Sequence, residues 1–367
     1  MTATQAAIKD LQQSFSDPRR AAAAAGLGYS TGDDGPGIAR VRQGKAFVYS
    51  KSGKPVRDDA TLARIKSLAI PPAWEKVWIC PAPSGHVQAI GYDARGRKQY
   101  RYHPDWRAHR DLAKYTHVIG FAESLPQIRA AVRRDLRKPG LPREKVLAAT
   151  VRVLEKTLIR NGNEQYTREN HTYGLSTLQD RHASIAGEKV TFDFRGKHGV
   201  KRHVSFRDPK LAGIVKACRD LPGSELFQYV RDDGKVVDIK CGDVNAYLKQ
   251  ISGRDFTAKD FRTWAGTLLA ARALQAMEAA DTQTQVKRNI VSAIEATAAR
   301  LGNTTAVCRK CYVHPAVLSS YMDGSLMKAL RRKINAKLSH GGRGLSAEEQ
   351  SVLRLLRSTL TTMAGGG

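Results

Sequence analysis

Apolar and polar residues alternate along several short runs in the first hundred residues of the chain. This alternation, typical of half-buried β-strands, is found at residues 39–42, 46–49, 77–80 and 87–92. Three-to-four spacing over residues 61–68 predicts one short helix, which two prolines end. We therefore expect a small sheet-rich domain over residues 36–110, preceded by a flexible arm over residues 1–35 that is rich in alanine, glycine and aspartate.

Beyond residue 110 apolar residues recur every three or four positions, which predicts helices. Such spacing is found at residues 125–137, 144–161, 261–277, 327–338 and 346–363. Strand-like runs at residues 174–178, 190–194 and 204–206 interrupt the helices, and a glycine-containing turn at residues 195–199 predicts a hairpin. Residues 111–367 are thus expected to form a mainly helical domain with a small β-sheet, and the fold class is α+β.

Charge points to the class of partner. The 367 residues include 61 lysines and arginines against 34 aspartates and glutamates, a net charge of +27. This surplus favours a polyanion such as duplex DNA, although a basic surface without such a role is the alternative. No run approaches the ~20 apolar residues of a membrane span. Five scattered cysteines fit a reducing cytoplasm, and Cys308 with Cys311 is expected to serve packing rather than zinc binding.

Four segments carry residues suited to attack on a phosphodiester. Arg160 precedes a glycine-containing turn, Lys197 follows Phe-x-Gly in the hairpin turn, Arg262 stands in Lys-Asp-Phe-Arg-Thr, and Tyr312 follows Gly-Asn-Thr by eight residues. Arginine can bridge two phosphate oxygens and stabilise the charge that grows on them. Lysine can give a proton to a leaving alkoxide, and nearby cations favour a nucleophilic phenolate.

These four segments, in this order, resemble the active-site set of type IB DNA topoisomerases, in particular the small bacterial and poxvirus branch. The resemblance implies that Arg160 and Arg262 grip the scissile phosphate. It also implies that Lys197 protonates the departing 5′ oxygen and that Tyr312 takes the 3′ phosphate. In the poxvirus enzymes a histidine stands in the place of Asn303. Asparagine can donate the same hydrogen bond to a nonbridging oxygen but carries no charge.

The resemblance also implies a monomer that closes on duplex DNA as a C-shaped clamp and relaxes supercoils without ATP, metal or another cofactor. We expect it in the cytoplasm, on the nucleoid. A basic and aromatic segment of the N-terminal domain is predicted to contact DNA, and we call it the DNA grip. A lysine three residues before Arg262 is also expected to contact DNA. These residues are Arg97, Lys98, Gln99, Tyr100, Arg101 and Lys259. By the resemblance, Gln99 and Tyr100 enter the major groove. A solvated edge strand is the alternative.

Other interpretations remain open at this point. A tyrosine recombinase uses the same chemistry, but recombinases usually have histidine at the position of Lys259. An architectural DNA-binding protein would explain the charge but not the four reactive positions. Tyr321 is a second candidate nucleophile, yet no Gly-x-Thr segment precedes it at the required distance. Residues 91–98 mimic part of a phosphate-binding loop but lack the closing Gly-Lys-Ser/Thr, so no ATP site is expected.

Overall fold

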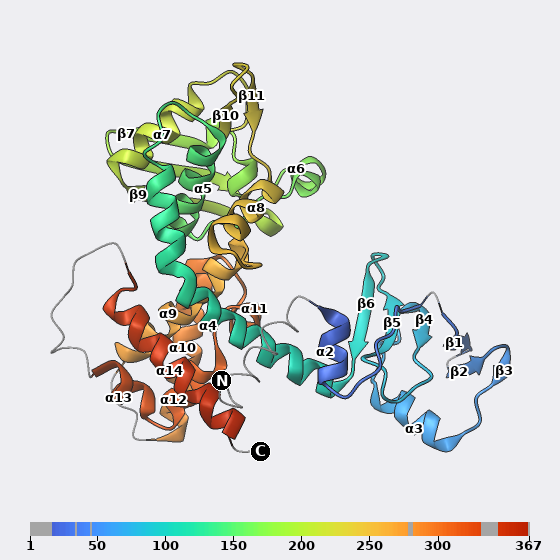
Figure 1. Ribbon diagram of the computed structural model, residues 1–367. Helices are drawn as coiled ribbons and strands as arrows, with labels where there is room; N and C mark the ends of the chain where they lie inside the picture. Colours follow the sequence, from blue (N-terminus) through green and yellow to red (C-terminus); the bar gives the residue numbers. More distant parts are fainter. Residues whose placement is uncertain (1–16, 34, 45, 278–281, 332–343, 366–367) are drawn as a thin grey trace. The chain divides into compact units, whose positions relative to one another are not determined.

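The computed structural model describes residues 17–33, 35–44, 46–277, 282–331 and 344–365. The chain divides into two compact units, residues 1–117 and 118–367. An antiparallel sheet dominates the first unit and helices dominate the second (Figure 1). The predicted α+β class is confirmed. None of the described helices is both long and apolar enough to cross a membrane.

The first unit is built on a six-stranded antiparallel sheet in the order β3-β2-β1-β4-β5-β6. Ile38, Val77 and Ile79 of this sheet form a core with Ile65 of the helix α3. The elements are β1 (Ile38–Gln43), β2 (Ala46–Lys51), β3 (Lys54–Pro55), α3 (Asp59–Ser67), β4 (Glu75–Ile79), β5 (Val87–Tyr92) and β6 (Lys98–Tyr102). The predicted strands and short helix are therefore confirmed, and β6 adds the edge strand.

The beginning of the chain departs from the predicted flexible arm. Helix α2 (Pro18–Ala24) is capped by Asp17, whose carboxylate accepts two backbone N–H bonds. Ala21 and Ala22 are buried in a cluster with Trp106. Residues 17–33 thus include a packed helix, because small alanine side chains allow close approach to the tryptophan. Residues 1–16 lie outside the described residues.

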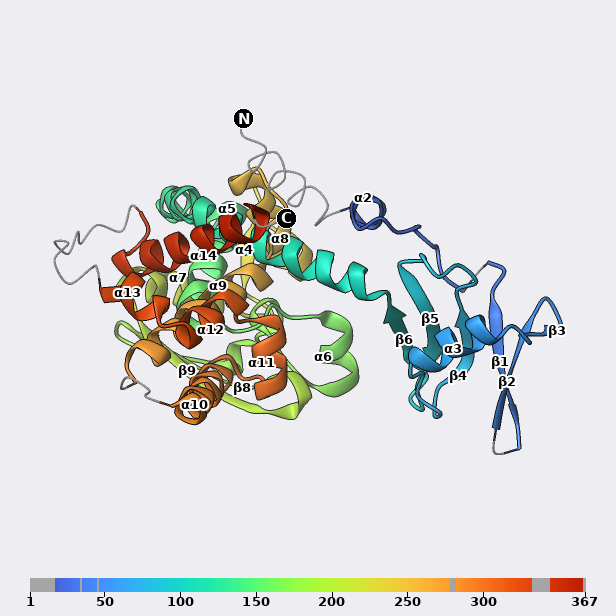
Figure 2. The same cartoon turned by 90° about the horizontal axis from the view of Figure 1, so that it is seen from below.

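Helices α5 and α9 form the centre of the second unit. Helix α5 packs against α7, α8 and α9, and α9 also packs against α10, α12, α13 and α14 (Figures 1 and 2). The helices are α4 (Pro104–Asp135), α5 (Arg143–Thr157), α6 (Glu164–Asn170), α7 (Pro209–Arg219), α8 (Cys241–Ser252), α9 (Ala258–Gln275), α10 (Gln283–Leu301), α11 (Thr305–Cys311), α12 (Pro315–Met322), α13 (Ser325–Arg331) and α14 (Ala347–Gly365). Helix α4 contains the boundary between the two units.

The predicted helices at residues 144–161, 261–277 and 346–363 are confirmed as α5, α9 and α14. The helix expected at residues 125–137 is only the end of the much longer α4, which continues through Pro126. Of the helix expected at residues 327–338, the part after residue 331 lies outside the described residues. A partly buried ion-pair group ties three helices together: guanidinium nitrogens of Arg129 in α4 lie 2.7 Å from a carboxylate oxygen of Glu155 in α5 and 2.7 Å from one of Glu349 in α14.

Two small sheets complete the second unit. Strands β7 (Ala183–Ala186), β8 (Lys189–Arg195) and β9 (Lys201–Arg207) form an antiparallel sheet, and β10 (Gln228–Val230) pairs with β11 (Val236–Asp238). The predicted hairpin is confirmed as β8–β9. Its tip is the 3₁₀ turn η3 (Lys197–Gly199), in which His198 and Gly199 have positive φ.

The strand expected at residues 174–178 is wrong. This segment forms the buried 3₁₀ turn η1 (Leu175–Thr177), followed by a second short turn, η2 (Asp180–His182). The Thr177 hydroxyl accepts a hydrogen bond from the Gly174 amide at 3.0 Å, which closes the turn locally. Apolar content alone did not reveal this local hydrogen bond, which competes with strand pairing.

Candidate active site

The Arg160 turn is braced by the buried turn η1. Helix α5 ends at Thr157, and its C-cap residue Leu158 has a left-handed backbone, so the chain leaves the helix just before Arg160. The Leu175 amide donates to the Arg160 carbonyl oxygen at 2.8 Å. A Cβ added at Gly162 would lie 2.5 Å from the Thr177 hydroxyl oxygen, and one at Gly174 would lie 2.6 Å from the Arg160 carbonyl oxygen. Glycine fits both positions because the Thr177 side chain lies against Gly162 and the backbone of residues 160–162 lies against Gly174.

Arg262 is placed by the start of helix α9. The Asp260 carboxylate accepts from both the amide and the hydroxyl of Thr257, at 2.8 and 3.0 Å, and so closes the first helical turn. Arg262 then points inward and is only 2% exposed. Its guanidinium donates to the carbonyl oxygens of Leu158 and Leu301. It therefore joins the end of α5, before Arg160, to the end of α10, before Asn303.

Tyr312 caps helix α11, directly after the last residue of that helix. Its backbone lies against α9, where a Cβ on Gly266 would be 2.6 Å from the Tyr312 carbonyl oxygen. The Arg262 guanidinium carbon lies 5.1 Å from the centre of the Tyr312 ring. Sequence reasoning missed Gly266, since a glycine inside a helix carries no signal of what it approaches.

Asn303 follows Gly302, the left-handed residue that caps α10. Arg160 donates to both the Gly302 carbonyl oxygen, at 2.8 Å, and the Asn303 side-chain oxygen. The Asn303 amide nitrogen is buried and has no hydrogen-bond partner among the described residues. A buried donor left in this state costs free energy unless a ligand accepts from it.

Lys197 and Arg202 come from the β8–β9 hairpin. Lys197 is exposed at its tip, whereas the half-buried Arg202 reaches across to α10. Arg202 lies over Gly302, where an added Cβ would be 2.2 Å from a guanidinium nitrogen, and it donates to the Arg300 carbonyl oxygen at 3.4 Å. Sequence reasoning missed Arg202. Its position two residues before the buried Val204 of an alternating strand was the available signal.

Four of the five predicted catalytic residues line two adjoining pockets that share the two arginines, whereas Asn303 lines neither and reaches the site only through its contact with Arg160. Arg160, Arg262 and Tyr312 line the first, of about 300 Å³, together with Lys259. Arg160 and Arg262 also line the second, of about 20 Å³, together with Lys197, Arg202 and Gly302. We call the second the lysine pocket. Neither pocket has a carboxylate among its lining residues.

The charges of the arginines in this site are poorly compensated. Burial, and to a smaller extent the neighbouring Arg160, lower the pKa of Arg262 to about 10, although Tyr312 acts in the opposite direction. Burial also lowers the pKa of Arg202, as do the charges of Arg160 and Arg300. A pKa of about 10 keeps Arg262 cationic at neutral pH. Buried cations without carboxylates are stabilised when an anion binds between them.

The predicted DNA grip of the first unit lies at and just before the edge strand β6. Strand geometry puts Lys98 and Tyr100 on one face and Gln99 and Arg101 on the other. Tyr100 is exposed and stacks on Tyr102 with ring centres 5.6 Å apart. The cations of the grip have partners within the chain, which are Asp93 for Arg97, Asp33 for Lys98 and the Ala69 carbonyl oxygen for Arg101.

The rival tyrosine and the cysteine pair occupy different surroundings. Tyr321 is 8% exposed, and its hydroxyl accepts a hydrogen bond from Asn289 at 2.6 Å, so it lines neither pocket of the site. Cys308 is buried and Cys311 is half-buried. Burial raises the pKa of the Cys308 thiol to about 11, which keeps it protonated and suits the expected packing role.

Comparisons with known proteins agree on one family. The family model for the catalytic core of eukaryotic DNA topoisomerase I matches residues 103–338, and that for the N-terminal domain of bacterial DNA topoisomerase IB matches residues 46–93. A DNA topoisomerase 1B of Acanthamoeba polyphaga mimivirus is 33% identical over 297 residues, 78% of this chain and 88% of that protein. The DNA topoisomerase 1B of Vaccinia virus (strain Copenhagen) is 22% identical over 303 residues, 79% of this chain and 92% of the viral one. The chain belongs to the type IB DNA topoisomerase family, whose enzymes break and rejoin DNA.

Proposed function

We propose that this protein relaxes positive and negative DNA supercoils by transesterification through a 3′-phosphotyrosyl intermediate at Tyr312. The observation that carries the proposal is the pocket that Tyr312 shares with Arg160 and Arg262. A nucleophile beside two partly desolvated cations, with no carboxylate in the lining, suits attack on a phosphodiester.

In the proposed reaction the Tyr312 phenolic oxygen, after losing its proton to solvent, bonds to the scissile phosphorus. The bond from phosphorus to the 5′ oxygen breaks, and Lys197 gives that oxygen a proton. Arg160, Arg262 and the Asn303 amide donate to the nonbridging oxygens, where negative charge grows. In the reverse step the 5′-hydroxyl attacks phosphorus, returns its proton, and releases Tyr312.

The proposal includes independence from metal and ATP. Protein cations supply the charge stabilisation at the phosphate that a bound metal would otherwise give. The phosphotyrosyl bond conserves the phosphodiester energy, so resealing needs no nucleotide. Lys259, exposed beside the Tyr312 pocket, is proposed to contact DNA there.

Duplex DNA is the proposed substrate, and the net charge of +27 supports it. We further propose that β6 and the preceding turn contact DNA through residues 97–101, that the two units close on the duplex as a clamp, and that the enzyme acts as a monomer. Its proposed location is the cytoplasm, on the nucleoid.

The test is relaxation of positively and negatively supercoiled plasmids in EDTA, without nucleotide. Wild-type protein should relax both, and Tyr312→Phe should bind DNA but form no covalent adduct after denaturation. A strict magnesium requirement, or relaxation of negative supercoils alone, would contradict the proposal. A covalent adduct in Tyr312→Phe would place the nucleophile elsewhere.

A further inference from the structure

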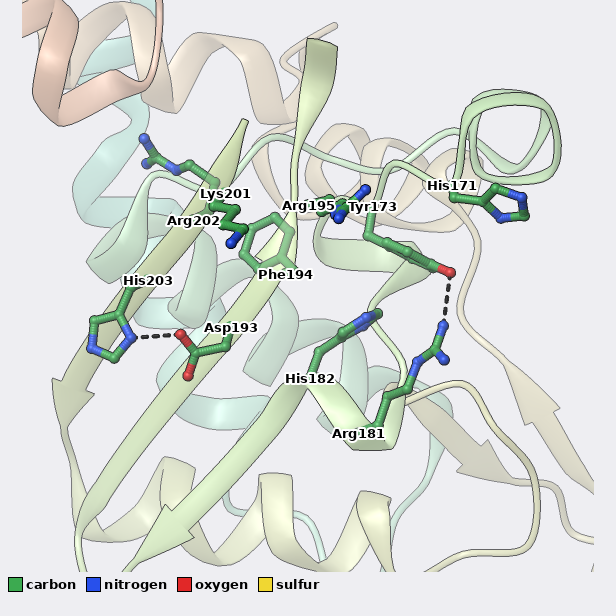
Figure 3. A pocket seen from close by; sticks show the side chains of 10 residues that line it. All are labelled: His171, Tyr173, Arg181, His182, Asp193, Phe194, Arg195, Lys201, Arg202 and His203. Carbon is green, nitrogen blue, oxygen red and sulfur yellow. Dashed lines mark hydrogen bonds and ion pairs between the residues drawn. The ribbon is translucent and has the colours of Figure 1, made fainter. Parts of the chain in front are cut away.

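A larger pocket, whose lining side chains are drawn in Figure 3, adjoins the lysine pocket on the side of the β8–β9 hairpin. It has a volume of about 730 Å³ and lies between the loop at residues 171–174, the turn η2 and the hairpin; we call it the side pocket. Tyr173, Phe194 and Arg202 line both the side pocket and the lysine pocket. The two pockets therefore adjoin, and Arg202 is the cation that lines both.

The side pocket carries an excess of positive charge. Arg181, Arg195, Lys201 and Arg202 line it, and its one lining carboxylate, Asp193, lies 2.5 Å from a ring nitrogen of His203 (Figure 3). Arg195 and Lys201 are direct cross-strand partners in the hairpin. Like charges in such a position destabilise a sheet, and a polyanion bound across them would remove that cost.

The wall of the side pocket is fixed before any ligand binds. The Tyr173 amide donates to the Arg195 carbonyl oxygen at 2.7 Å, and the Tyr173 hydroxyl accepts from Arg181 at 3.0 Å. The Tyr173 ring also lies 4.4 Å, centre to centre, from the His182 ring. An aromatic side chain held among cations is the combination that binds single nucleic-acid strands.

The two pockets of the active site indicate which DNA strand would reach the side pocket. Tyr312 lines one pocket and Lys197 the other, with Arg160 and Arg262 common to both. In an in-line displacement the leaving oxygen departs opposite the nucleophile, hence on the Lys197 side. The side pocket adjoins the lysine pocket, and hence lies on that side.

We propose that the side pocket binds the phosphates of the leaving strand, the strand that carries the free 5′-hydroxyl after cleavage. This inference rests on the proposed function. Held there, the strand end stays near the phosphotyrosine, which favours resealing and restrains rotation of the cut strand. Cleavage itself does not require this contact, because the scissile phosphate is gripped in the other two pockets.

The test mixes a preformed covalent adduct with a short 5′-hydroxyl oligonucleotide. The rate at which the adduct is resealed is measured at increasing concentrations of the oligonucleotide. The variant is Arg181→Gln/Lys201→Gln. The control is Arg207→Gln, which removes an exposed cation at the far end of the same strand, β9. The double variant should need about ten-fold more oligonucleotide for half-maximal resealing, since each lost phosphate contact weakens binding. Its cleavage rate and maximal resealing rate should stay within about two-fold of wild type.

A second oligonucleotide, with neutral methylphosphonates at its first linkages, identifies the contact. Wild type should bind this oligonucleotide about ten-fold more weakly than the unmodified one. The double variant should bind both equally, because the cations that would contact the charged linkages are already removed. An equal loss in Arg207→Gln, or full sensitivity of the double variant to the neutral linkages, would overturn the inference. Wild-type protein that forms no adduct would overturn the proposed function, and the inference with it.

Discussion

Arg160 donates a guanidinium hydrogen bond to the side-chain oxygen of Asn303. This contact turns the Asn303 amide nitrogen away from Arg160, and that nitrogen is buried without a hydrogen-bond partner among the described residues. The pair thus places a guanidinium and a buried amide donor, from two elements far apart in sequence, side by side. Such preorganised donors stabilise a phosphoryl transition state without reorganisation.

Replacement of Asn303 should separate hydrogen bonding from charge. Asn303→Ala should lose ~2–4 kcal/mol of transition-state stabilisation, so single-turnover cleavage should slow about a hundred-fold or more with little change in DNA affinity. Asn303→His should keep most of the activity, because imidazole can also donate. Asn303→Asp should be worse than alanine, since a carboxylate would pair with Arg160 and repel the phosphate. Wild-type cleavage in Asn303→Ala would remove this residue from the site.

Lys197→Ala should be rescued by a better leaving group. If Lys197 protonates the 5′ oxygen, a substrate with sulfur at the 5′-bridging position needs no proton to leave. The variant should therefore cleave slowly on normal DNA and regain most of its rate on the sulfur substrate. Equal defects on the two substrates would reduce Lys197 to a phosphate contact.

Gly266→Ala should displace Tyr312. The added methyl would lie 2.6 Å from the Tyr312 carbonyl oxygen and 3.2 Å from its Cβ, so the tyrosine must shift by a fraction of an ångström or more. We expect cleavage about ten-fold slower or worse, with DNA binding unchanged. Gly213→Ala in α7 is the matched control, because nothing lies within 4 Å of its added methyl. Similar activity of both variants would contradict the packing argument.

Glu349→Gln should destabilise the second unit in a pH-dependent way. Burial raises the pKa of Glu349, but hydrogen bonding to Arg129 and its charge outweigh this, and the net pKa is lowered. A lowered pKa stabilises the folded state above the unfolded value, about 4.3, and that contribution is lost as pH falls through the folded pKa. At pH 7 the substitution should lower the free energy of unfolding by about 3 kcal/mol, measured by urea denaturation. This difference between variant and wild type should shrink below about pH 4.

The exposed pair of Glu123 and Arg357 provides the comparison for that measurement. Glu123→Gln should lower the free energy of unfolding by less than about 1 kcal/mol, because solvent screens an exposed ion pair. A loss as large as that of Glu349→Gln would show that burial is not what distinguishes the two pairs.

The sequence by itself determined the α+β class, most strands of the first unit, and the helices α5, α9 and α14. It did so because alternation and three-to-four spacing report directly which side chains are buried. It also selected Arg160, Lys197, Arg262, Asn303 and Tyr312, since each stands in a short local segment that resembles the family. These choices needed no contact between distant residues.

Only the tertiary structure decided how those segments meet. Arg262 donates to the ends of two different helices, Gly266 gives room to the Tyr312 backbone, and Arg202 reaches from the hairpin to Gly302. The turn η1 likewise forms where a strand was expected, and its Leu175 amide donates to the Arg160 carbonyl oxygen. None of these contacts leaves a periodic signal, because each depends on the approach of backbone segments that are far apart along the chain.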